Sequence, residues 1–367
     1  MLAIKAFEKI SNLFNKNELK VKVINIKDDI EKGLIIFLNG NFIEFKNTFL
    51  MIKDIENYYL IKKSYYTKEI KVNDSIPFSK DEIIICDKYY NISYIKLDNN
   101  FNIKKMIFKN IMNNNYNIEL YDTKLKYLKN GKFAYLIKKK QNSTYAYEYK
   151  NTEINILSYK NNELIYETKI EALNDIYIIK SRKEYLLFYF DDNRLKVANS
   201  NNFKIKKEFK IQYNDLIIKH KIQLINDNLF FYFHLGDLYL RDLINMKIIE
   251  KIDIDEIYGV YKYKNNTFLT FERVKTFFGN EKYYLRKYEI NKKEKKIKLL
   301  AEINLDDYFQ VKYSGVKSIK VYDIKGCDNL FLIFVEKNYI PITNHSDFVD
   351  FLKRKDEEIV FYIFRIL

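Results

Sequence analysis

The residues best able to carry out chemistry here are three histidines, His220, His234 and His345. His220 and His234 fall in neighbouring β-like stretches, but a metal site would need a third ligand, and no cysteine or further histidine lies near them in sequence. A Ser-His-Asp triad would need a nucleophile, and the sequence has no Gly-x-Ser-x-Gly elbow to supply it. The spacing therefore predicts ordinary core or surface imidazoles rather than a metal centre or a catalytic triad.

The remaining candidate groups point the same way. Neither the G-x-x-x-x-G-K nor the G-x-G-x-x-G phosphate-binding motif occurs. The carboxylate pairs Asp191-Asp192 and Asp306-Asp307 fall at predicted strand ends, where aspartate commonly stabilises turns. Cys86 and Cys327 form neither a disulfide framework nor a metal-ligand spacing. The sequence thus predicts no enzymatic activity, no metal and no cofactor.

The formal net charge of +15 is the strongest compositional signal, and it has two interpretations. It favours an acidic partner, such as nucleic acid, an anionic membrane lipid or an acidic protein. It also fits a compositional bias toward lysine and asparagine, because only 7 of the 64 basic residues are arginine, the preferred residue for bidentate phosphate contacts. The basic runs Lys138–Lys140 and Lys292–Lys298 sit at strand ends, and either phosphate contact or a solvated edge would explain them.

Cellular location follows from what the sequence lacks. Unpaired cysteines fit a reducing compartment. The N-terminus carries Lys5, Glu8 and Lys9 where a signal peptide would be apolar. No run approaches the 18 or so apolar residues of a membrane span. We therefore expect a cytoplasmic protein without a transmembrane segment.

Residues 1–17 are predicted to contain a short amphipathic helix. Apolar residues recur at spacings of three and four and would form one stripe: Ala3, Ala6, Phe7, Ile10, Leu13 and Phe14. A helix of this length is marginal alone, so it either packs on the main body or docks on a partner or membrane surface.

Beyond this segment the chain is organised by a repeat. The stretch 173–305 contains the same order of short β-branched and aromatic strands three times, with polar turns between them. The period of about 40–50 residues is typical of repeat architectures. The hairpin signals Asn39-Gly40 and Asn130-Gly131 extend the pattern into the first half.

Grouping the strands by fours gives seven units, of which the last is one strand short. Glu18–Ile26 alternates like a strand and belongs to no unit of its own, so we expect it to complete the last one. The predicted units are 30–72, 75–108, 117–170, 173–211, 216–254, 255–305, and 316–367 together with 18–26. The boundaries within 30–170 rest on turn signals alone, so six or eight units remain alternatives.

The segment Leu238–Asp242, followed by Ile248-Ile249, resembles the third strand of a WD40 repeat and the strand after it. Asp242 matches the aspartate of that family's Trp-Asp dipeptide, whereas Arg241 stands at the tryptophan position. The chain has no tryptophan and no Gly-His dipeptide, so the family's Asp–His network is not carried over. The resemblance implies an all-β, seven-bladed β-propeller of four-stranded antiparallel blades, closed by an N-terminal strand, as a single domain over 18–367.

Two insertions, Arg273–Lys282 and Glu336–Glu358, interrupt predicted blades between the second and third strands. In a propeller these loops emerge on the face that also carries the links between blades. Binding residues concentrate on loops held by a rigid scaffold. Alternatively, both insertions fold back and cover the propeller's own surface. The candidate partner-binding residues are Arg273, Lys275, Phe277, Phe278, Phe348 and Phe351.

Aromatic anchors with a basic rim are typical of protein interfaces. We therefore predict a non-enzymatic scaffold that binds a protein or peptide partner on this face. The alternatives are an electrostatic binder of nucleic acid or anionic lipid, and a divergent propeller enzyme acting through carboxylates around the central channel. The sequence does not identify the partner or the oligomeric state.

Overall fold

A computed structural model of the chain describes the strands and some of the turns between them. The residues described are 17–26, 34–66, 69–111, 121–139, 152–172, 176–180, 185–191, 194–210, 222–226, 229–234, 237–242, 247–263, 266–275, 281–291, 296–309, 314–339 and 357–367. Within them, seven antiparallel four-stranded sheets form, and one of these gains a short fifth strand. The predicted helix in 1–17 lies outside the described residues, except that Asn17 begins strand β1 (Asn17–Glu18).

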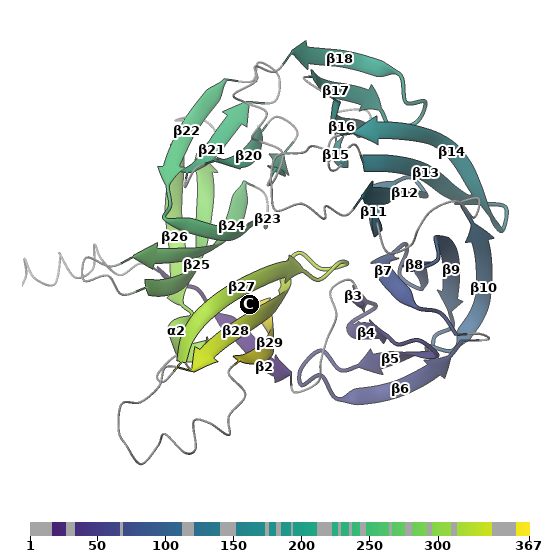
Figure 1. The fold of residues 1–367 in the computed structure, drawn as a ribbon, viewed down its shortest axis with the longest axis horizontal. Helices are drawn as coiled ribbons and strands as arrows, with labels where there is room; N and C mark the ends of the chain where they lie inside the picture. Colours follow the sequence, from purple (N-terminus) through teal and green to yellow (C-terminus); the bar gives the residue numbers. More distant parts are fainter. Residues whose placement is uncertain are drawn as a thin grey trace, which may run out of the picture. The chain divides into compact units, whose positions relative to one another are not determined.

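The chain divides into two compact units. Unit 2 comprises 30–220 together with 324–327 and contains four sheets, each built from consecutive strands. The strands are β3 (Ile35–Leu38), β4 (Asn41–Phe45), β5 (Phe49–Lys53), β6 (Leu60–Tyr65); β7 (Val72–Pro77), β8 (Glu82–Asp87), β9 (Asn91–Leu97), β10 (Ile103–Asn110); β11 (Tyr121–Lys129), β12 (Lys132–Lys139), β13 (Thr152–Lys160), β14 (Glu163–Ala172); β15 (Ile176–Lys180), β16 (Tyr185–Asp191), β17 (Arg194–Asn199) and β18 (Ile205–Lys210). Figure 1 shows these sheets following one another in chain order, with first strands inside and fourth strands outside.

Unit 1 comprises 1–29, 221–323 and 328–367. Its strands are β19 (Ile222–Asn226), β20 (Leu229–His234), β21 (Asp237–Asp242), β22 (Ile248–Asp253); β23 (Glu256–Lys262), β24 (Thr267–Lys275), β25 (Glu281–Asn291), β26 (Lys296–Asn304); and β27 (Ser314–Asp323), β28 (Leu330–Tyr339), β29 (Glu357–Ile366) with β2 (Val21–Ile26). A single helical turn, α2 (Asp306–Phe309), follows β26. The short strand β1 runs parallel to β26 along its outer edge.

The last sheet is completed by the N-terminal strand, as the sequence predicts. Strand β2 pairs antiparallel with β29 from Val21 opposite Ile366 to Ile26 opposite Phe361. Figure 1 shows the purple β2 beside the yellow β29, although they lie at opposite ends of the sequence. The sheet order β2-β29-β28-β27 makes β2 its fourth strand.

Both predicted Asn-Gly hairpins are confirmed. Asn39 and Gly40 have φ values of 48° and 82°, and Leu38 pairs with Asn41 across the turn. Asn130 and Gly131, with φ values of 51° and 68°, join β11 to β12 in the same way. Positive φ at both central residues is the geometry of a two-residue hairpin turn, and asparagine and glycine adopt it at low cost.

One strand boundary of the sequence prediction is wrong. The first sheet ends with β6 at Tyr65, and Val72 begins the second sheet instead of ending the first predicted unit, 30–72. Strand β7 reads Val-Asn-Asp-Ser-Ile-Pro, which lacks apolar alternation and resembles a turn. Asp74 and Ser75 are nonetheless buried, because hydrogen bonds described below satisfy the Asp74 carboxylate.

The cores lie between consecutive sheets. In unit 2, for example, Ile43 and Ile52 of the first sheet pack with Ile83 and Ile95 of the second. The next core joins the second sheet to the third through residues such as Tyr94 and Phe133. A sheet that lies between two others of its unit, such as the second or third sheet of unit 2, therefore buries both of its faces, which explains the near-continuous apolar runs within its second and third strands.

The outer edges carry two protective features. Six of the seven fourth strands in the described residues, β6, β10, β14, β18, β22 and β26, pair with their third strand through a register shift. Several are also lysine-rich: β10 reads IKKMIFKN and β18 reads IKKEFK. Bulges and edge lysines hinder pairing with other chains. Part of the net positive charge therefore has a structural role.

Cys86 should resist alkylation in the native protein. Its side chain is fully buried, and burial together with the nearby Asp74 charge raises the pKa of the Cys86 thiol well above its ordinary value. Since the thiolate is the reactive species, iodoacetamide should label Cys86 only after unfolding. Peptide mass spectrometry at neutral pH, with half-buried Cys327 as internal comparison, tests this. Rapid native labelling of Cys86 would contradict it.

Candidate functional site

The root of the first insertion is formed by β24 and β25. The two strands stay paired as far as Lys275 opposite Glu281, so they run further than predicted and the intervening loop shortens to 276–280. The predicted position of this insertion, between the second and third strands of its sheet, is confirmed.

Arg273 joins three strands at this root. Its guanidinium donates to Glu281 on β25 at 2.7 Å and forms an ion pair with Glu256 on β23. Burial opposes the charge, but Glu256, Tyr258 and Glu281 hold the pKa of Arg273 above its ordinary value. The charge of Arg273 is therefore balanced by two carboxylates of its own sheet.

Two tyrosines surround this ion network. Burial, with a smaller contribution from Glu256, raises the pKa of Tyr258 to about 12. Burial also raises the pKa of Tyr283, whose hydroxyl donates to Glu281 at 3.3 Å. Both phenols stay neutral at physiological pH, and their rings lie 6.2 Å apart between centroids. The root of the loop is thus a packed, charge-balanced platform.

Lys275 lies at the exposed end of β24. Its backbone N–H donates to the Asp255 carboxylate at 2.7 Å, which fixes the main chain where the loop begins. Its side chain is exposed. Of the two predicted basic rim residues, Lys275 is therefore the more accessible to a partner.

The second insertion has a similar root in the next sheet. Strands β28 and β29 pair from Leu330 opposite Arg365 to Asn338 opposite Glu357, which shortens this loop to 340–356. The Ser318 hydroxyl on β27 donates to Glu336 on β28 at 2.7 Å. This insertion also falls between the second and third strands of its sheet, as predicted.

The two sheets that carry the insertions share one core. The Tyr261 hydroxyl on β23 donates to the carbonyl of Val321 on β27 at 2.8 Å. The ring centroid of Phe331 on β28 lies 4.9 Å from that of Tyr261 and 5.5 Å from that of Phe271 on β24. These contacts pack the two sheets that carry the insertions against each other.

The predicted aromatic anchors are not placed by the structure. Phe277, Phe278, Phe348 and Phe351 lie outside the described residues, as do His220 and His345. Among the described side chains, no group of three His, Cys, Asp or Glu is arranged to hold a metal ion. No helix in the described part of the chain is long and apolar enough to cross a membrane.

Sequence analysis missed a buried ion network beneath the first insertion. Glu272 on β24 is 1% exposed and accepts from Arg286 on β25 at 2.7 Å. It also accepts from the hydroxyls of Thr270 and Tyr288. The Arg286 Nε donates to Glu302 on β26 at 3.0 Å, so the network spans three strands. A signal was present in the sequence, because Glu272 is an acidic residue in the largely apolar strand β24 and the neighbouring strand β25 offers the basic residue Arg286.

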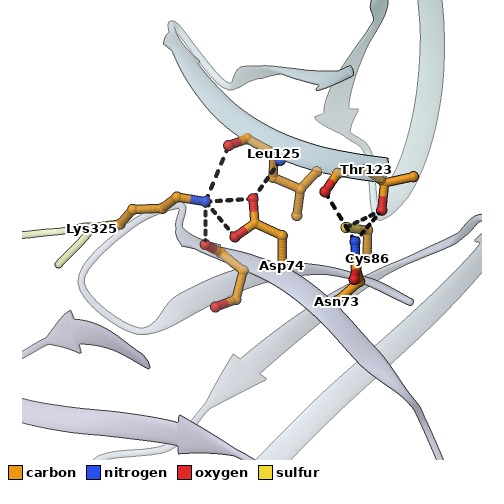
Figure 2. Close-up of polar contacts among 7 residues, drawn as sticks. Asn73, Asp74, Cys86, Thr123, Leu125 and Lys325 are labelled. Atoms are coloured by element: carbon orange, nitrogen blue, oxygen red, sulfur yellow. Dashed lines mark hydrogen bonds and ion pairs between the residues drawn. The ribbon is translucent and has the colours of Figure 1, made fainter. Parts of the chain in front are cut away.

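A second missed cluster centres on Lys325 in unit 2. Figure 2 shows its ammonium on Asp74, with both carboxylate oxygens at 2.6 Å. The ammonium also donates to the carbonyls of Ser75 at 3.1 Å and Leu125 at 3.3 Å, and the Leu125 N–H donates to Asp74 at 2.7 Å. Nearby, Asn73 donates to the carbonyl and hydroxyl of Thr123.

The turn that carries Lys325 lies against a first strand. The Phe37 N–H donates to the Lys325 carbonyl at 2.8 Å, and Ile36 and Lys325 form an isolated parallel bridge. Gly326 has φ +102°, and a Cβ there would collide with the Phe37 carbonyl. Glycine is therefore needed at this position. The segment 324–327 thus contacts the first strands of three successive sheets, β3, β7 and β11.

Comparison with known proteins identifies the fold. No known family model matches the chain, and no curated protein matches it in sequence. Solved structures do match: the WD40 domain of SCAP from fission yeast, at 10% identity and TM-score 0.50, with 95% of this chain and 98% of that one covered. This chain has a WD40-like β-propeller fold.

Two other solved β-propeller domains also match the chain. The Cps50 (Swd1) β-propeller domain of Myceliophteria thermophila matches with 8% identity and TM-score 0.50, covering 94% of this chain and 98% of that one. The WD40 β-propeller domain of Doa1 matches with 13% identity and TM-score 0.50, covering 94% and 97%. At such identities the likeness concerns the fold alone.

Within this WD40-like fold, the predicted motif match falls in its proper place. Strand β21, third in its sheet, ends at Arg241-Asp242, where the family has Trp-Asp. Arg241 is buried, with 7% of its surface exposed. Blades of this chain are braced instead by acid–base pairs between second and third strands, as in Glu44–Lys53 at 2.7 Å, Glu82–Lys96 at 3.2 Å and Glu272–Arg286.

Proposed function

We propose that this WD40-like propeller is an interaction scaffold that binds a protein or peptide partner through the hairpins β24–β25 and β28–β29. The observation that carries the proposal is the shared core of the two blades, in which the rings of Tyr261, Phe271 and Phe331 pack together. Binding residues concentrate on loops that a rigid scaffold positions, and a base that is already packed needs no ordering when a partner binds.

The charges at the roots refine the proposal. Arg273 is balanced by Glu256 and Glu281, and Asp255 lies beside Lys275. These described residues do not form a basic patch of the kind that phosphate binding needs. A partner held here would depend on the aromatic side chains proposed at the loop tips, with Lys275 at the rim.

The double substitution Phe277→Ala with Phe278→Ala tests this site. We expect partner capture to fall about tenfold or more, because truncating a central aromatic anchor commonly costs 2 kcal/mol or more. The measurement is affinity capture with tagged full-length protein from native extract, after nuclease treatment and at two salt concentrations, quantified by mass spectrometry.

Tyr166→Ala on the outer strand β14 is the matched control, since Tyr166 is an exposed aromatic on a strand that belongs to neither hairpin. Partners retained by the control and lost by the double variant support the site. Equal capture by wild type and double variant would overturn the site assignment. Loss of every partner on nuclease or salt treatment would favour the electrostatic alternative.

A further inference from the structure

Strand β6, the outer edge of the first sheet, combines an open edge with exposed apolar side chains. It is last in the order β3-β4-β5-β6. Ile61 and Tyr65 are 55% and 67% exposed, and Tyr59 and Leu60 beside them are also exposed. Half of the backbone groups of an edge strand point away from its partner and can pair with another chain.

One face of β6 is already occupied within the sheet stack. The Ser64 hydroxyl donates to the Phe101 carbonyl at 2.6 Å. Lys62 donates to the Asn100 carbonyl at 2.7 Å and to the Asn102 side chain at 2.5 Å. These contacts anchor β6 to the turn before β10, so the strand is held in place without using its outer edge.

The opposite face of β6 presents a row of alternating positions. Ile61, Lys63 and Tyr65 are all exposed, and successive alternate residues of a strand share one face. The Tyr65 ring lies 5.5 Å from Phe49 on β5, and the Lys63 ammonium lies 5.1 Å from the same ring. The row is therefore apolar at both ends with a cation at its centre.

The positive charge of Lys63 in this row determines which kind of added strand can pair with β6. Within the described part of the chain, neither Lys62 nor Lys63 forms an ion pair: Lys62 donates to Asn100 and Asn102, and Lys63 lies over the Phe49 ring. A second copy of the same edge would bring lysines against lysines, and like charges directly opposite are destabilising. An acidic strand would instead place a carboxylate opposite Lys63.

The chain itself provides a precedent for strand addition in this fold. The outer edge of β26, also a fourth strand with a register shift, carries the added parallel strand β1. One outer strand of this protein therefore accepts a further, two-residue strand despite its bulge.

We propose that the outer edge of β6 binds an extended, acidic segment of a partner protein as an added strand. Backbone hydrogen bonds supply affinity, and the row of Ile61, Lys63 and Tyr65 selects a segment with apolar residues on either side of an acid. This surface belongs to a different sheet from the hairpin site proposed above.

The probe is a fluorescent synthetic peptide in which threonines alternate with a valine, a glutamate and a second valine. A matched peptide carries lysine in place of glutamate. With full-length protein, we expect saturable binding of the glutamate peptide, a preference of about tenfold over the lysine peptide, and reversal of that preference in Lys63→Glu. Hydrogen exchange should slow at the amides of Leu60–Tyr65 when the glutamate peptide binds.

Ile61→Ser should weaken binding, whereas Ile205→Ser should not, since Ile205 is a comparably exposed isoleucine (50%) on the outer strand β18. The Phe277→Ala, Phe278→Ala variant should bind the peptide normally. Equal effects of Ile61→Ser and Ile205→Ser would overturn the proposal. So would the absence of protection in β6, self-association through this edge, or no saturable binding below about 1 mM.

Discussion

Replacing Lys325 with methionine should destabilise the region around β7 by about 3 kcal/mol, because removing one partner of a buried ion pair leaves the other charge uncompensated. Asp74 would keep the Leu125 N–H but lose an ammonium that contacts both of its oxygens. Its side chain is only 7% exposed, so water cannot replace the lost partner.

The native alkylation rate of Cys86 measures this effect directly. Cys86 lies on β8, which pairs with β7, and it reacts only when this region opens. A loss of about 3 kcal/mol should accelerate labelling about 100-fold, since each 1.4 kcal/mol corresponds to a factor of ten.

Two further variants separate the loss of the ion pair from the loss of a lysine side chain as such. Lys320→Met removes an exposed lysine from β27 and should leave the labelling rate unchanged. Adding Asp74→Asn to Lys325→Met should recover much of the loss, because the amide is neutral and its oxygen can still accept from Leu125. An unchanged rate in Lys325→Met alone would show that the pair contributes little.

Replacing Arg286 with methionine should have an effect of similar size in unit 1. Glu272 would remain buried with only the hydroxyls of Thr270 and Tyr288 as donors, and an unpaired buried carboxylate commonly costs about 3–5 kcal/mol. Hydrogen exchange of peptides from β24 and β25 should accelerate by about 100-fold or more.

The comparison for Arg286 is an arginine in an exposed pair. Arg194 donates to Glu208 at 2.7 Å, but its side chain is 63% exposed, so Arg194→Met should cost less than about 1 kcal/mol. Glu272→Gln combined with Arg286→Met should restore part of the stability by removing the buried charge. Equal costs for the Arg286 and Arg194 variants would contradict the role assigned to burial.

The repeat was predictable because it depends on signals between residues that are close in sequence. Each blade is built from consecutive strands, and signals such as Asn39-Gly40 fix the turns between them. The pairing of β2 with β29 was also predictable, although it is not local. An unassigned alternating strand and an incomplete last unit leave few other solutions.

Strand β7 and the Lys325 cluster were not predictable from the same signals. The polar residues Asn73, Asp74 and Ser75 read as a turn until their partners are known, and the partner of Asp74 lies 251 residues away. Periodicity records burial of apolar side chains, and it carries no information about a buried carboxylate satisfied by a distant lysine.

The positions of the two insertions in their sheets were predictable, and the lengths of their loops were less so. Two loops longer than a hairpin turn marked the insertions, and both fall where expected. The continued pairing of Arg273 with Tyr283, and of Lys337 with Glu358, was missed because charged residues on a strand resemble loop sequence. The balanced charge of Arg273 likewise depends on Glu256, which comes from another strand.

The pairing of β2 with β29 determines when the last blade can fold during synthesis of the chain. The four strands of each of six sheets are close in sequence, so these sheets can form as their strands leave the ribosome. Strand β2 can pair with β29 only after Ile366, the residue opposite Val21, has been synthesised. At about 5–20 residues per second, that delay is on the order of 20 to 70 s. Throughout this delay, β2 lacks its partner strand β29, because β29 is synthesised last. That interval is when a chaperone would be most useful to this protein.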